Sequence, residues 1–200
     1  TLAELYQLTG RYALAEPLYT RALAILEQVP GPKDRPELAA TLHGLAMLYL
    51  DQGRHERSEP LYKRALAMRE KIFGPEHPAV ALSLNDFALL YHDQEQYKLA
   101  ESLYKRSLAI REKALGSDHP DVAESLNNIG LLYQYQARYT LALPLYERAL
   151  TILEKTLGPY HSNVGTCLNN IALVYYYQNH YERAVPIYTR ALAIREKALG

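Results

Sequence analysis

The sequence SLNNIGLLY at residues 125–133, continued by ARYTLALPLYERALTILEKTLG at 137–158, occurs four more times in similar form, complete or shortened, along the 200-residue chain. Leu42, Leu84, Leu126 and Leu168 are spaced 42 residues apart. Units with such a period stack on one another and share a continuous core. The sequence therefore predicts a single repeat array from 1 to 200, with a shortened unit at 1–28 and four more at 37–72, 79–115, 121–157 and 163–199.

Each unit is predicted to form two amphipathic helices, so the fold class is all-α. In the unit at 121–157, Leu126, Ile129 and Tyr133 lie on one face of the first helix, because they are spaced by three or four residues. Small residues are expected where the two helices cross, as in the pairs Ala46/Ser58, Ala88/Ala100, Gly130/Ala142 and Ala172/Ala184. A proline recurs in four of the five second helices and predicts a bend early in each, at Pro17, Pro60, Pro144 and Pro186.

The pattern Leu-x-x-Ile-Gly-x-x-Tyr, followed by Tyr-x-x-Ala-x-x-x-Tyr-x-x-Ala, resembles the tetratricopeptide signature, with Leu126 where that family usually has tryptophan. The 42-residue period, the Asn-Asn pair and the linker DHPDV at 118–122 resemble more narrowly the repeats of kinesin light chains and their bacterial relatives. This resemblance implies a right-handed superhelical solenoid, with first helices lining a concave groove and second helices on the convex side. It also implies a protein-interaction scaffold.

Composition narrows the classes of partner. Lys+Arg and Asp+Glu are 22 each, so the chain lacks the long-range field of a protein that binds nucleic acid or an acidic membrane. No apolar run approaches the ~20 residues that span a bilayer. The single cysteine, Cys167, fits a reducing compartment, and we expect a cytoplasmic location. The chain opens inside a repeat and ends at Gly200, so we expect it to be part of a longer protein.

Tyrosine is unusually frequent, at 18 residues, and fourteen of these occupy repeat-core positions, Tyr181 among them. Three of the others, Tyr135, Tyr176 and Tyr177, follow the core tyrosines of first helices, and the resemblance places them in the groove. Rigid aromatic rings are good binding anchors there. The alternative is ordinary packing between neighbouring first helices.

Pairs of asparagines precede these tyrosines on the same helices by about two helical turns, at 127–128 and 169–170. Because asparagine offers both a donor and an acceptor, a row of asparagines can bind the backbone of an extended peptide, as the resemblance to kinesin light chains implies. The alternative is that the amides only face water. The complete set of predicted groove residues is Asn85, Asp86, His92, Asp93, Asn127, Asn128, Gln134, Tyr135, Asn169, Asn170, Tyr176 and Tyr177.

The charge of the predicted groove limits its ligand. Positions that are basic in kinesin light chains are here Asp51, Asp93, Tyr135 and Tyr177, so the expected peptide or protein partner is neutral to basic. Lysines of a carboxylate clamp are absent at the corresponding positions Ala40, Leu82, Glu124 and Thr166, which argues against chaperone tails.

No motif indicates catalysis, a cofactor or a metal site. His77, His119 and His161 recur in the linkers, one helix pair apart, so we expect helix capping rather than shared coordination. Runs of mixed charge around Arg69 and Arg111 are expected on the solvated convex face, which argues against nucleic acid. Two other functions stay open: a structural module that self-associates through its shortened ends, and a regulatory docking segment of a larger enzyme or signalling protein.

Overall fold

The structure, a computed structural model, describes residues 1–28 and 35–199, and within these it consists of ten α-helices and no strand. Most of the proline-rich connection predicted at 29–36 lies outside the described residues. The helix contacts divide the chain into two compact units, 1–103 and 104–200. The single continuous array stays a prediction.

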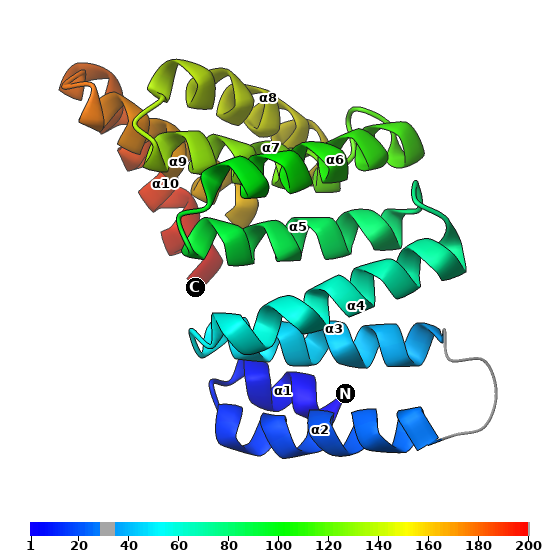
Figure 1. The fold of residues 1–200 in the computed structure, drawn as a ribbon. Helices are drawn as coiled ribbons and strands as arrows, with labels where there is room; N and C mark the ends of the chain where they lie inside the picture. Colours follow the sequence, from blue (N-terminus) through cyan, green and yellow to red (C-terminus); the bar gives the residue numbers. More distant parts are fainter. Residues whose placement is uncertain (29–34, 200) are drawn as a thin grey trace. The chain divides into compact units, whose positions relative to one another are not determined.

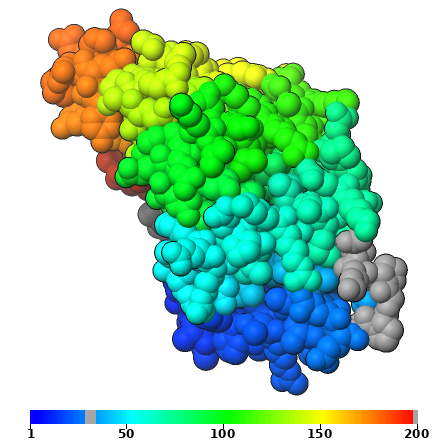
Figure 2. Space-filling view, viewed as in Figure 1, coloured from blue at the N-terminus to red at the C-terminus, as the bar shows by residue number. Residues whose placement is uncertain are grey.

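In unit 1, α1 packs on α2, α2 on α3, α3 on α4, and α4 on α5 (Figure 1). Within this unit, Figure 2 shows the residues of the first helix pair, in dark blue, against those that follow, in light blue and cyan. The helices are α1 (Leu2–Leu8), α2 (Tyr12–Gln28), α3 (Pro36–Asp51), α4 (His55–Phe73), α5 (Pro78–Asp93) and the first part of α6 (Tyr97–Leu115).

Unit 2 repeats this arrangement. Helix α7 packs on α8, α8 packs on α9, and α9 packs on α10. The unit holds the rest of α6, together with α7 (Pro120–Tyr135), α8 (Tyr139–Leu157), α9 (Ser162–Tyr177) and α10 (Tyr181–Leu199).

The linker histidines cap first helices, as predicted. The Nδ1 atoms of His77, His119 and His161 accept hydrogen bonds from the backbone N–H two residues later, at 3.1, 3.1 and 3.2 Å. These bonds satisfy donors that the first turn of a helix leaves unpaired. In α5 and α7 a proline follows the histidine directly, at a position where its missing N–H has no helical partner.

The small residues are buried between paired helices. Ala46, Ser58, Ala88, Ala100 and Ala142 are completely inaccessible to solvent. Ser58 Oγ donates to the carbonyl of Ala46 across the α3–α4 contact, at 2.8 Å. The backbones approach closely at this crossing because neither side chain is large.

Two arginines contradict the prediction of a solvated second-helix face. Arg69 and Arg111 are only 8% and 3% exposed. Arg111 Nη1 donates to the carbonyl of Asp121 at 2.8 Å and to Ser125 Oγ at 2.9 Å. Arg69 makes the equivalent bond to Ser83 Oγ. The prediction was wrong at these positions because the guanidinium groups reach the first helix of the next repeat, where hydroxyl and carbonyl acceptors compensate their burial.

The turn inside each repeat holds one residue in the left-handed region. Gly10 and Gly53 occupy it in the first two repeats, whereas Glu95, Ala137 and Asn179 occupy it later, with φ of 59°, 55° and 61°. A side chain makes this conformation unfavourable, and alanine has no local hydrogen bond to offset the cost.

Ala137→Gly is therefore expected to stabilise unit 2 by about 0.5–1 kcal/mol, because the residue already has a conformation that glycine adopts freely. Urea unfolding followed by circular dichroism measures this change. The reverse substitution in unit 1, Gly53→Ala, serves as the control and should cost a similar amount. Loss of stability in the Ala137→Gly variant would contradict the turn geometry.

Candidate functional site

Neighbouring first helices are joined by polar side chains, and all of these except His43 belong to the predicted groove set. In unit 1, His43 Nε2 lies 3.0 Å from Asp86 Oδ2, which joins α3 to α5. In unit 2, Asn170 Nδ2 donates to Asn127 Oδ1 at 3.0 Å, which joins α7 to α9. The two pairs occupy the same repeat positions. Part of the predicted amide row therefore links successive repeats within each unit.

The remaining amides differ in their burial. Asn85 is 5% exposed, and its Nδ2 donates to Asp86 Oδ1 at 3.2 Å. Asn127, Asn128 and Asn169 are half-buried. Asn127 also lines a hollow of about 150 Å³ between α7 and α9, with Glu124 and Thr166 at its edge. In unit 2, the half-buried amides of α7 and α9 are therefore more accessible than Asn85 is in unit 1.

Gln134 holds a core tyrosine. Its Oε1 accepts a hydrogen bond from the hydroxyl of Tyr146 at 3.0 Å, just as Gln7 accepts one from Tyr19 at 3.2 Å. In the second repeat the position of this glutamine is taken by Leu50, and within the described residues the buried hydroxyl of Tyr62 has no partner. Burial raises the pKa of Tyr62 and of Tyr146, so both are neutral donors at physiological pH.

Tyr62→Phe is expected to leave unit 1 as stable as before or about 1 kcal/mol more stable, because it removes a buried hydroxyl without a partner. Tyr146→Phe, the matched variant in unit 2, should cost about 1 kcal/mol, since its hydroxyl is bonded to Gln134. Denaturant unfolding of both variants provides the comparison. Equal losses in the two variants would refute the difference in hydroxyl pairing.

Exposed tyrosines gather at the C-terminal ends of α7 and α9. Tyr135 is 66% exposed, Tyr176 is 50% and Tyr177 is 52%. The rings of Tyr176 and Tyr177 meet edge to face, with centroids 5.7 Å apart, and Tyr177 stacks on Tyr139 of α8 at 6.0 Å. Such ring pairs hold each other in fixed orientations.

Tyr181 belongs to the same aromatic cluster, although its repeat register placed it in the core. It is 51% exposed, and its ring meets Tyr176 edge to face at 5.5 Å. The core prediction was wrong because Tyr139, at the same position of α8, is covered by Tyr177 of the following first helix, whereas no helix follows α10 in the described residues. We call Tyr139, Tyr176, Tyr177 and Tyr181 the tyrosine cluster. Sequence reasoning could have found it from three tyrosines within six residues at 176–181.

The acidic candidates lie in unit 1. Asp93 is exposed, and Asp51 is exposed and accepts from Gln7 Nε2 at 2.7 Å. His92, next to Asp93, is 8% exposed, and its ring lies 6.0 Å from that of Tyr97. Burial lowers the pKa of His92, while the adjacent carboxylate of Asp93 acts in the opposite direction. His92 is therefore neutral at pH 7.

Across 1–28 and 35–199, histidine, cysteine, aspartate and glutamate do not gather in groups of three or more that fit a metal ion. In the same ranges every helix is too short or too polar to cross a bilayer.

The family model of the tetratricopeptide repeat matches residues 1–71, 37–113, 88–155 and 121–197. The chain belongs to the tetratricopeptide repeat family. Tetratricopeptide arrays are in general non-catalytic scaffolds for protein–protein interaction. None of the curated proteins compared with this tetratricopeptide chain matches it.

Solved structures similar to this chain include a putative kinesin light chain with tetratricopeptide-like repeats. BtubC (BKLC) from P. vanneervenii is 27% identical, with a TM-score of 0.84 over 100% of this chain and 79% of that protein. A putative kinesin light chain from Podospora anserina, with nearly identical repeats, is 26% identical, with a TM-score of 0.79 over 98% and 93%. Aspartyl phosphate phosphatase F from Bacillus subtilis is 21% identical, with a TM-score of 0.82 over 97% and 49%, and shows likeness of fold alone.

Proposed function

We propose that this tetratricopeptide array is a non-catalytic scaffold that binds a segment of a partner protein along its first helices. The observation that carries the proposal is the exposure of Tyr135, Tyr176 and Tyr177 on α7 and α9, the same helices that bear the half-buried amides of unit 2. Aromatic anchors beside amide donors and acceptors are the combination that binds an extended peptide.

The geometry of the tyrosine cluster supports an anchoring role. Its rings already pack against one another at centroid distances of 5.5–6.0 Å, so little side-chain freedom remains to be lost on binding. Each ring nevertheless keeps accessible area, because Tyr176, Tyr177 and Tyr181 are about half exposed. A proline or aliphatic side chain of a ligand would bury this area.

The amide row supports binding with little sequence preference. Asn170 Nδ2 donates a hydrogen bond to Asn127 Oδ1, which fixes the orientation of the Asn127 amide. The Nδ2 group of Asn127 therefore points away from this bond. Asn128 and Asn169 are half-buried on the same two helices. Fixed amides can bond the backbone N–H and C=O groups of an extended chain without reading its side chains.

Charge favours a neutral or basic ligand. In unit 1 the exposed carboxylates of Asp51 and Asp93 occupy first-helix ends, and they would repel an acidic segment. In unit 2 the equivalent positions are the uncharged Tyr135 and Tyr177.

We also propose a cytoplasmic location. Cys167 is the one cysteine of the sequence and is buried as a free thiol, which fits a reducing compartment.

A random peptide library displayed on phage tests the proposal. The expected result is enrichment of peptides that carry proline or aliphatic residues, which match the tyrosine cluster of unit 2. Among peptides that bind unit 1, neutral or basic ones are expected, because its exposed carboxylates repel acidic chains. Enrichment of acidic peptides would contradict the charge assignment. The absence of any enriched peptide, at library concentrations that recover a known tetratricopeptide–peptide pair, would contradict peptide binding itself.

A further inference from the structure

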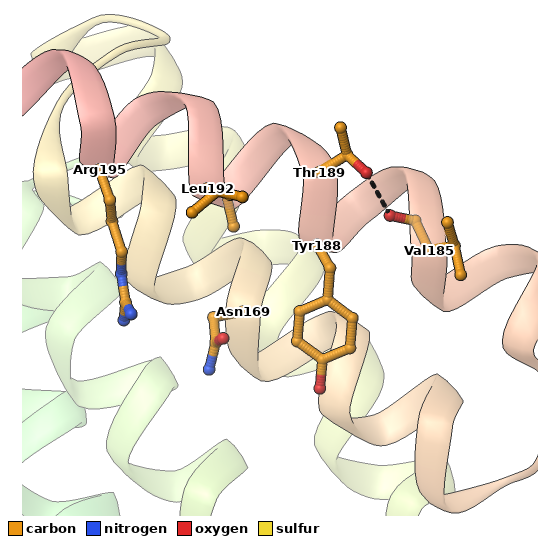
Figure 3. Close-up of a pocket in the computed structure, with 7 residues that line it drawn as sticks. Asn169, Val185, Tyr188, Thr189, Leu192 and Arg195 are labelled. Atoms are coloured by element: carbon orange, nitrogen blue, oxygen red, sulfur yellow. Dashed lines mark hydrogen bonds between the residues drawn. The ribbon is translucent and has the colours of Figure 1, made fainter.

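An arginine of the second helix fills the contact between repeats at two places in the structure. Arg69 and Arg111 each donate to a serine hydroxyl of the first helix that follows. The same position of α10 holds Arg195, and Figure 3 shows its side chain extending on the same side as Asn169 of α9. The chain itself therefore shows that a guanidinium group fits between a second helix and the first helices beside it.

Helices α2 and α8 have leucine at this position, Leu26 and Leu153. Beside Leu153, a hollow of about 150 Å³ lies between α7 and α9. Leu153 and Asn163 line it, and they stand where Arg111 and its acceptor Asp121 stand one repeat earlier. The hollow therefore adjoins the place that a guanidinium group takes in another repeat of this chain.

The rim of the hollow offers hydrogen-bond acceptors. Glu124 of α7 and Thr166 of α9 are both exposed there. Thr166 Oγ1 donates to the carbonyl of Ser162 at 3.3 Å, so its lone pairs remain as acceptors. Glu124 Oε2 lies 3.6 Å from Nη1 of Arg111. Because a carboxylate has about four lone-pair sites, it can serve a second guanidinium group as well.

The corresponding site in unit 1 has a different rim. Ala40 and Leu82 stand where Glu124 and Thr166 stand two repeats later. Arg69 supplies a guanidinium group from within the chain there, and it donates to a serine hydroxyl. In unit 2, leucine in place of that arginine thus coincides with added acceptors on the rim.

The size and the floor of the hollow suit one long side chain. Pockets for drug-sized ligands measure about 300–1,000 Å³, so this hollow is too small for such a ligand. Ala123 and Leu153 are 0% and 5% exposed and form an apolar floor. Arginine combines an apolar stem with a planar group of five donors, so it can cover the floor and bond to the rim.

We propose that the hollow between α7 and α9 binds an arginine side chain of the partner segment, with its guanidinium group on Glu124 and Thr166. This inference rests on the proposed function, whose segment lies along the same two helices. Glu124 and Tyr135 are eleven residues apart on α7, which is ~16 Å at ~1.5 Å per residue. An extended segment covers this distance in about five residues, so the arginine should lie about five residues from the residue that contacts Tyr135.

A small probe tests the hollow by itself. N-acetylarginine N-methylamide, titrated up to about 20 mM, is expected to shift the backbone amide NMR signals of Asn163 and Thr166 until they saturate. N-acetylcitrulline N-methylamide has the same shape without the charge, so it should bind at least fivefold more weakly. Signals that do not respond to the arginine probe, or equal binding of the two probes, would overturn the proposal.

Two variants locate the bound probe. Glu124→Gln removes the charge of the rim and should weaken binding of the arginine probe at least fivefold. Leu153→Arg/Cys167→Ser gives unit 2 a second buried arginine–serine pair, which fills the hollow and should abolish binding. Glu147→Gln removes an exposed carboxylate elsewhere on α8 and is the matched control, which should bind like the parent. Circular dichroism checks that each variant keeps its helices. Parent-like binding by either Glu124→Gln or the filled variant would contradict the site.

The peptide library separates this inference from the proposed function. The parent is expected to enrich peptides with arginine, and Leu153→Arg/Cys167→Ser should bind them at least tenfold more weakly. Enriched peptides without arginine, bound equally by the parent and this variant, would overturn the arginine site and leave the proposed function standing. A library without enriched peptides would contradict the proposed function, and the arginine probe would still decide whether the hollow takes a guanidinium group.

Discussion

Replacing Gly130 by leucine is expected to destabilise unit 2 by about 3 kcal/mol, the largest effect of any substitution proposed for this chain. A Cβ atom at this position would lie 2.7 Å from Cε1 and 2.9 Å from Cδ1 of the Tyr146 ring. The ring is completely buried, and its hydroxyl is bonded to Gln134, so it has no free space to move into. The longer leucine side chain must displace the whole helix pair.

Gly130→Ala should be milder, at about 1 kcal/mol, because Ala46, Ala88 and Ala172 occupy the same position in other repeats. Thr140→Leu, at an exposed site on α8, is the control and should change stability by about 0.5 kcal/mol or less. Urea unfolding of the three variants measures the series. A leucine variant that unfolds with the parent would show that α7 and α8 do not pair as described.

Arg111→Leu is expected to cost unit 2 about 2–3 kcal/mol. The substitution leaves the hydroxyl of Ser125 and the carbonyl of Asp121 without the donor that lies 2.9 and 2.8 Å away. Both acceptors are at the contact of α6 with α7, and Ser125 is completely buried. Water cannot replace the lost donor at Ser125.

The next repeat has a different pair of buried residues at the same two positions. Leu153 and Cys167 stand where Arg111 and Ser125 stand one repeat earlier, and both are buried. Burial raises the pKa of Cys167 to about 12, so the thiol stays protonated and can donate to the carbonyl of Tyr146 at 3.2 Å. The double variant Arg111→Leu/Ser125→Cys should therefore recover at least about 1 kcal/mol of the loss.

Arg148→Leu provides the matched control, because this arginine is 43% exposed in its pair with Glu112. Its removal should cost about 0.5 kcal/mol or less. Denaturant unfolding distinguishes the three variants. Equal losses at Arg111 and Arg148, or a double variant less stable than Arg111→Leu alone, would contradict the buried role of Arg111.

The repeat period predicted the helices because residues at equivalent repeat positions, such as Leu126 and Leu168, are expected to have the same local structure. Capping was predictable from His77, since a linker histidine before a helix has nearby backbone donors. Arg69 and Arg111 were not, because a basic residue flanked by opposite charges has the pattern of a surface site. Their burial depends on Ser83 and Ser125, which lie 14 residues away in the next repeat.

In the candidate site too, the exposure of single residues was predictable from the sequence, whereas contacts between helices were not. Exposure of Tyr135 and Tyr177 followed from their offset to the core tyrosines, and the structure shows both as exposed. The bond between Asn127 and Asn170 was not predictable, because it depends on which faces of two first helices meet. Tyr181 joined the cluster for a related reason: the turn between α9 and α10 brings it to Tyr176.

Peptide binding along α7 and α9 is tested most directly by titrating the best library-selected peptide into Asn127→Ala/Tyr135→Ala by calorimetry. We expect the double variant to bind at least tenfold more weakly than the parent, since one aromatic anchor contributes about 2 kcal/mol. Its helicity should be unchanged, and its unfolding midpoint should fall only slightly, because Asn170 Nδ2 loses the Oδ1 acceptor of Asn127. Tyr160→Ala, which removes an equally exposed tyrosine outside this surface, should bind like the parent. Unchanged affinity in Asn127→Ala/Tyr135→Ala would contradict the proposed binding surface.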